Sequence, residues 1–164
     1  MNKRYVIDTI PNSTTVAIYR VPKGAEIISG GTMVEPMSIQ YKTTEYEKYR
    51  EQYGIAFIFE DNIPVIDFYT VPLINVFATD SFGGFFGRLE TSTEISCEEP
   101  ICYINQKKDC FIVANSANEF LRFINEGLWE NILKTTKKTN QIVVYKSKAD
   151  AEESGVMFLG NQQM

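Results

Sequence analysis

The sequence predicts an α+β fold in which a mostly antiparallel, multi-stranded sheet is flanked by a few helices. Short runs rich in β-branched and aromatic residues alternate with turn residues, and two segments instead repeat apolar residues at helical spacing. Hydrophobic residues make up 44% of the 164 residues and charged residues 23%, as in ordinary ordered proteins. A chain of this length can bury a core without metals or disulfides, so we expect residues 1–164 to form a single domain.

The first 40 residues predict strands. Their β-prone runs are Tyr5–Asp8, Thr15–Val21 and Ala25–Ser29. Between and after these runs stand proline and glycine residues, which supply the backbone angles that turns require. We therefore expect a meander of strands in this part of the chain.

A helix is predicted from Thr44 to Tyr53. Glu47 follows Thr44 by three residues, as in a capping box, and Gly54 stands where a helix C-cap favours glycine. The helix repeats tyrosines at helical spacing, namely Tyr46, Tyr49 and Tyr53. This stripe most simply packs on the sheet. The alternative is an exposed recognition surface, because tyrosine is enriched at interfaces.

Six further runs predict the strands of the central sheet. They are Ile55–Phe59, Ile63–Tyr69, Leu73–Ala78, Phe85–Glu90, Ile101–Asn105 and Cys110–Ala114. The first two are joined by a tight polar turn, which indicates a hairpin, and so are the last two. Because several of the apolar runs are nearly continuous, we expect the sheet to be covered on both faces.

The segment from Ser116 to Gly127 predicts the clearest helix of the chain. Ser116 and Glu119 form a second capping box. Apolar residues then recur on one helical face, namely Ala117, Phe120, Leu121, Ile124 and Leu128. This face must pack on the sheet. A strand at Gln141–Tyr145 and a short helix at Ser147–Ser154 are expected in the remaining chain.

The chain contains no histidine. This excludes Ser-His-Asp, Cys-His and histidine–metal sites, which are the commonest designs of hydrolases and metalloenzymes. The one local concentration of carboxylates comprises Asp80, Glu90, Glu94, Glu98 and Glu99. It matches no motif that fixes a metal ion or a catalytic pair, and Gly83-Gly84 precedes a strand where a phosphate loop would precede a helix. We therefore predict no catalytic residues, no metal and no cofactor.

The cysteines, the net charge and the lack of long apolar stretches indicate which ligands and which localisation to expect. The three cysteines lack the spacing of zinc or redox sites, and Cys102 and Cys110 are expected to be buried in strands. The net charge of −5 disfavours nucleic acid, and the basic run from Lys134 to Lys138 is interpreted as a solvated helix end. No apolar stretch has the length of a signal-peptide core or a membrane span, so we expect a cytoplasmic protein without membrane contact.

Three motifs follow one another between residues 73 and 125. They are the turn Ala78-Thr-Asp80-Ser-Phe-Gly83-Gly84, the hairpin of Ile101–Asn105 with Cys110–Ala114, and the helix start Asn115-Ser116 leading to Glu119-Phe120-Leu121. In this order and spacing they resemble the central signature of the SMI1/KNR4 (SUKH) family. Family members commonly begin with helices, whereas the first 40 residues here predict strands.

The resemblance implies a non-catalytic function. Many bacterial members of the family are immunity proteins that bind and neutralise a cognate toxin, often a nuclease. An acidic chain suits this role, because complementary charge speeds association with a basic partner. We therefore expect stoichiometric binding of a protein toxin or another protein through an acidic surface that includes Asp80, Glu94, Glu98 and Glu99.

Other functions stay open at the level of sequence. Fungal members of the family regulate cell-wall synthesis, which implies a regulatory scaffold as one alternative. A carboxylate- or metal-dependent enzyme is another. A third is a small-molecule sensor with an aromatic pocket built from Phe82, Phe85, Phe86 and Trp129. Because adjacent residues of a strand point to opposite faces, Phe85 and Phe86 are not expected to line the same pocket.

Overall fold

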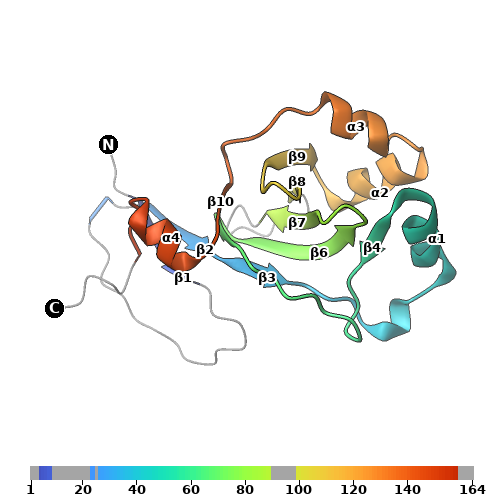
Figure 1. The fold of residues 1–164 in the computed structure, drawn as a ribbon, viewed down its shortest axis with the longest axis horizontal. Coiled ribbons are helices and arrows are strands. Elements are labelled where there is room, and N and C mark those ends of the chain that lie inside the picture. Colours follow the sequence, from blue (N-terminus) through green and yellow to red (C-terminus); the bar gives the residue numbers. More distant parts are fainter. Residues whose placement is uncertain (1–3, 9–22, 25, 90–98, 159–164) are drawn as a thin grey trace.

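A six-stranded sheet forms the centre of the computed structural model, which describes residues 4–8, 23–24, 26–89 and 99–158 (Figure 1). The strands are β3 (Thr32–Val34), β4 (Ile55–Phe57), β6 (Ile74–Asp80), β7 (Phe85–Leu89), β8 (Ile101–Ile104) and β9 (Cys110–Ala114). They lie in the order β3-β6-β7-β8-β9, and β4 also pairs with β6. Since β6 to β9 form an antiparallel meander, the predicted α+β class with a mostly antiparallel sheet is confirmed.

Two short strands share one edge of β6. β3 runs parallel to Ile74–Val76, and β4 runs antiparallel to Ala78–Asp80. The chain between them leaves the sheet, forms the short 3-10 helix η1 (Ile39–Tyr41) and the helix α1 (Thr44–Tyr53), and returns to the same edge. This arrangement places α1 beside the end of β6 where the chain turns into β7 (Figure 1).

Helix α1 has the predicted bounds. Gly54 caps it in the left-handed conformation, with φ of 70°, which glycine adopts without steric cost. The predicted capping box at Thr44 is wrong, because the N-cap residue is Thr43 and its side chain makes no capping hydrogen bond. Tyr49 is buried and Tyr46 packs against the same core, so the tyrosine stripe faces the sheet.

Helices α2 (Ala117–Asn125) and α3 (Trp129–Thr135) cover one face of the sheet. The Ser116 hydroxyl accepts a hydrogen bond from the Glu119 N–H at 3.1 Å, which confirms the predicted cap of α2. Phe120 and Ile124 are buried, whereas Leu121 is only partly buried. The aromatic and aliphatic side chains of α2 therefore fix this helix on the sheet.

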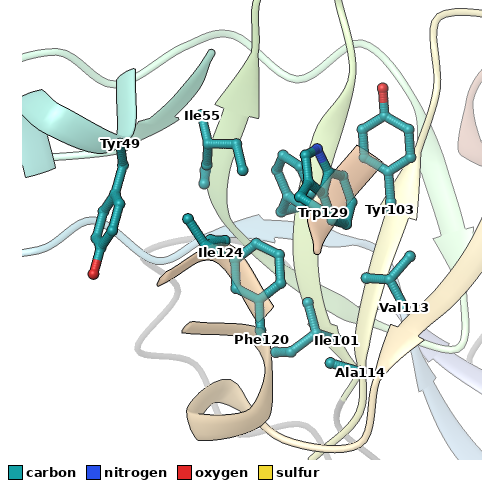
Figure 2. Packing of buried hydrophobic residues seen from close by; sticks show 11 residues of the cluster. Tyr49, Ile55, Ile101, Tyr103, Val113, Ala114, Phe120, Ile124 and Trp129 are labelled. Atoms are coloured by element: carbon teal, nitrogen blue, oxygen red, sulfur yellow. The ribbon is translucent and has the colours of Figure 1, made fainter. Parts of the chain in front are cut away.

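Aromatic rings dominate the core beneath these helices. The ring centroid of Phe86 lies 4.9 Å from that of Tyr103, 5.2 Å from that of Phe120 and 5.0 Å from that of Trp129. Figure 2 shows Trp129 beside Tyr103, with Phe120 reaching up from α2. Rings at these separations and tilts attract one another beyond the burial of their area, so the cluster contributes strongly to stability.

A second core covers the opposite face, as the sequence predicts. Cys102 and Cys110 are buried in it as free thiols, which confirms their expected burial. Phe85 also points to this side, where its ring centroid lies 5.1 Å from that of Phe68. Phe85 and Phe86 therefore face opposite sides of β7. The third cysteine, Cys97, lies outside the described residues.

A third group of elements joins the two ends of the described chain. It comprises β1 (Arg4–Asp8), β2 (Glu26–Gly30), β5 (Tyr69–Val71), β10 (Val143–Tyr145) and α4 (Lys148–Glu153). Ser147 caps α4 through its hydroxyl, as predicted, and the Val6 N–H donates to the Met157 carbonyl at 2.8 Å. The first and last parts of the described chain thus pack on each other through Val6, Ala151 and Phe158.

Two predicted strand pairings are wrong. β1 and β2 pair in parallel, whereas neighbouring strands of a meander pair antiparallel. The predicted strand Thr15–Val21 lies outside the described residues. Ile63–Tyr69 forms no hairpin with β4, because β4 pairs with β6 and Pro64 lacks an N–H to donate. Strand structure begins only at Tyr69, which pairs with β10.

Candidate protein-binding surface

The turn between β6 and β7 is closed by the carboxylate of Asp80. One carboxylate oxygen accepts from the N–H groups of Phe82 at 3.0 Å and Gly84 at 2.6 Å. The other accepts from the phenol of Tyr103, and the Asp80 N–H donates to the Gly84 carbonyl at 3.1 Å. The Tyr103 ring approaches Gly84 so closely that a Cβ there would lie 2.4 Å from the phenol oxygen. Asp80 and a glycine are therefore what this turn requires.

Phe82 is displayed by this turn. Its side chain is 78% exposed, although the backbone on both sides is held by Asp80. A single exposed apolar residue is ordinary, but a large aromatic ring on a rigid turn loses little freedom when it binds. Rigid aromatic anchors of this kind supply much of the binding energy of protein interfaces.

A small hollow lies between α1 and β4. It has a volume of about 90 Å³, room for one side chain and below the roughly 300–1,000 Å³ of small-molecule sites. Its lining residues are Lys42, Tyr46, Glu47, Arg50, Ala56, Phe57, Phe59, Asp61 and Asn62. Ala56 pairs with Thr79, so this part of the hollow lies at the end of β6 that leads into the turn.

Charged and apolar side chains line the hollow. The Lys42 ammonium lies 3.1 Å from the Asp61 carboxylate and 5.6 Å from the centre of the Phe59 ring. Both ends of this ion pair are about half exposed, so it adds little to stability. Ile39 and Tyr41, just before Lys42, are themselves more than half exposed. An apolar centre with a charged rim is typical of protein interfaces.

The carboxylates predicted to form one acidic surface do not lie together where the structure describes them. Asp80 ends β6 and is occupied by its own turn, whereas Glu99 precedes β8 and pairs with Arg88, which also binds Glu35. Because β6 and β7 are antiparallel, these two carboxylates lie at opposite ends of the strands, about 20 Å apart. Glu94 and Glu98 lie outside the described residues.

The four aromatic residues expected in the alternative sensor pocket do not line one pocket. Phe86 and Trp129 lie in one core, Phe85 packs against the other, and Phe82 is exposed. The available signal for the exposure of Phe82 was a large apolar residue inside the turn motif Asp80-Ser-Phe-Gly83-Gly84, where folding alone favours small or polar residues. Within the described ranges, no group of three or more acidic or cysteine side chains could hold a metal ion.

Two phenols that donate to carboxylates, one buried and one partly buried, should make the protein less stable at high pH. Burial and hydrogen bonding to a carboxylate raise the pKa of Tyr103, next to Asp80, and that of Tyr69, next to Asp8, above the ordinary 10.0. Above pH 10 the unfolded chain loses these protons first, so the free energy of unfolding should fall there and be unaffected below. Urea unfolding from about pH 8 to about pH 11 should show this fall, and Tyr69→Phe with Tyr103→Phe should flatten it. An equally steep fall in the double variant would contradict this assignment.

No protein-family model, curated protein or solved structure matches this chain. No helix within the described residues has the length and apolar character that a membrane crossing requires.

Proposed function

We propose that this chain is a non-catalytic, cytoplasmic protein-binding domain that neutralises a protein toxin by forming a one-to-one complex with it. The observation that supports binding is the exposed Phe82 ring, whose turn is held by the Asp80 carboxylate. A protruding ring on a rigid turn suits a folded partner, because it can enter a pocket of the other surface with little loss of freedom.

The resemblance to SMI1/KNR4 proteins supports the toxin-neutralising role. The motifs that produce it coincide with the β6–β7 turn, the β8–β9 hairpin and the capped start of α2. The net charge of −5 adds a long-range attraction for a basic toxin, which would raise the rate of association.

The proposal is tested with the products of the genes that neighbour this one. A toxin among them should stop growth when expressed alone, and co-expression of this chain should restore growth. The purified pair should bind with one-to-one stoichiometry in calorimetry. If no neighbouring product is toxic, or if the toxic one does not bind this chain, the proposed function is wrong.

Phe82→Ala should weaken toxin binding by about 2 kcal/mol or more, the loss expected of a central aromatic anchor. Val143→Ala on β10 is the matched control, because it also shortens an exposed apolar side chain but lies far from the turn, and it should leave affinity unchanged. A second arm reverses the charges of Glu98 and Glu99 to lysine. If Phe82→Ala still protects cells fully against the toxin and the charge-reversed variant does not, the binding surface contains Glu98 and Glu99 and not Phe82.

A further inference from the structure

β9 is the last strand of the central sheet, and among the described residues one of its edges has no partner strand. Its other edge pairs with β8 along the whole strand. On the open edge, the described residues contribute one backbone hydrogen bond, from the Thr139 N–H to the Cys110 carbonyl at 2.9 Å. Among the described residues, no other backbone group bonds to this edge. The outward-facing backbone groups between Phe111 and Ala114 can therefore pair with an added strand.

An open groove follows this edge. It has a volume of about 810 Å³ and lies between β9 and the segment that follows α3. Its lining residues are Pro100, Ile112, Asn115, Lys137, Lys138, Thr139, Asn140 and Gln141. The groove is polar and shallow, which suits an extended peptide better than a compact apolar ligand.

The groove is basic in an otherwise acidic protein. Lys137 and Lys138 line it, Lys134 precedes them in the last turn of α3, and none of the lining residues is acidic. Lys138 lies 3.3 Å from the Asp109 carboxylate but remains 68% exposed, so this pair leaves the lysine accessible. The basic run therefore extends past the helix end that the sequence indicated and reaches the edge of the sheet.

Lysines can also serve to protect a sheet edge from aggregation. Lysines that protect a sheet edge are residues of the edge strand itself. β9 has the sequence Cys-Phe-Ile-Val-Ala and bears no charge, and the lysines lie on the opposite wall of the groove. Their position fits the recognition of a bound strand better than the repulsion of one.

We propose that this groove binds an extended, acidic segment of another protein, which adds to β9 as a further strand. The backbone of the segment pairs with the open edge of β9, and its carboxylates lie against Lys137 and Lys138. No residue of the β6–β7 turn lines this groove, and the proposal does not depend on the toxin-binding proposal.

The probe is a fluorescein-labelled peptide of alternating glutamate and valine residues, titrated with the full chain and followed by fluorescence anisotropy. We expect saturable binding that Lys137→Glu with Lys138→Glu weakens about tenfold, the result of losing two exposed charge pairs. Lys23→Glu with Lys48→Glu changes the net charge equally away from β9 and should leave affinity unchanged. Hydrogen exchange should slow at amides of β9 when the peptide is bound.

Two further peptides separate strand pairing from charge attraction. The same peptide with every second backbone nitrogen methylated keeps its charge but loses ladder donors, and it should no longer bind. A peptide of alternating lysine and valine should not bind either. Equal affinity of the methylated peptide, equal weakening by both double variants, or absence of binding would overturn the proposal. So would a concentration-dependent dimer that excludes the peptide, because the occupant would then be a second copy of this chain.

Discussion

Replacing Phe120 by alanine is expected to lower the free energy of unfolding by about 3–5 kcal/mol. Phe120 is only 1% exposed, and its ring centroid lies 5.2 Å from that of Phe86, 5.7 Å from that of Phe77 and 5.9 Å from that of Trp129. The substitution leaves a cavity between α2 and the sheet that rigid aromatic neighbours cannot fill. Urea unfolding followed by the fluorescence of the single tryptophan measures the loss directly.

Two matched variants control for this result. Leu121→Ala removes the next side chain of the same helix, and because Leu121 is only partly buried it should cost about half as much or less. Phe82→Ala removes the same side chain type from an exposed site and should change stability by less than about 0.5 kcal/mol. Similar losses for all three variants would mean that α2 is not held on the sheet by Phe120.

Asp80→Ala is the second substitution with a large expected effect, a loss of about 2–3 kcal/mol. The carboxylate accepts hydrogen bonds from two N–H groups of the turn and from the Tyr103 phenol. Hydrogen bonds to a charged group contribute about 1.5–3 kcal/mol each when buried, and the partial exposure of this turn reduces their sum. Chemical denaturation measures the loss, and proteolysis at the turn should become faster.

Conservative variants show which bond matters. Asp80→Asn keeps one acceptor oxygen for the turn and should lose less than Asp80→Ala, while Tyr103→Phe removes a single donor and should lose about 1 kcal/mol. An Asp80→Ala protein of unchanged stability that fails to bind a toxin would instead assign Asp80 to the binding surface.

Local signals in the sequence predicted α1, α2, α4 and most strands, but not α3. α1 was recognisable from its tyrosine spacing and its C-cap Gly54, and α2 from its apolar spacing and its N-cap Ser116. β6 to β9 were recognisable because each is a β-prone run that pairs with the next one along the chain. The pairing of β4 with β6 was not predictable in this way, because it joins residues across the segment 58–73. The parallel pairing of β1 with β2 depends on packing against α4, far along the chain.

The candidate site was harder to predict than the fold. The sequence shows the turn motif around Asp80, but this motif is compatible with two roles of the carboxylate. It can be a free surface charge, or it can accept hydrogen bonds from the backbone of its own turn. Only the position of Tyr103 on the neighbouring strand decides between them, because its phenol and the turn amides together occupy the carboxylate. The exposure of Phe82 follows from that same geometry.

The contact between β1 and the segment after α4 constrains the order in which the protein can fold during synthesis. Val6 can make its contacts with the Met157 carbonyl and with Phe158 only after these residues have left the ribosome. They leave it after every strand of the central sheet. The sheet and α2 can form while β1 and β2 still lack their apolar cover. A nascent chain should therefore hold a folded centre with an open N-terminal portion, and this portion is where a chaperone would bind.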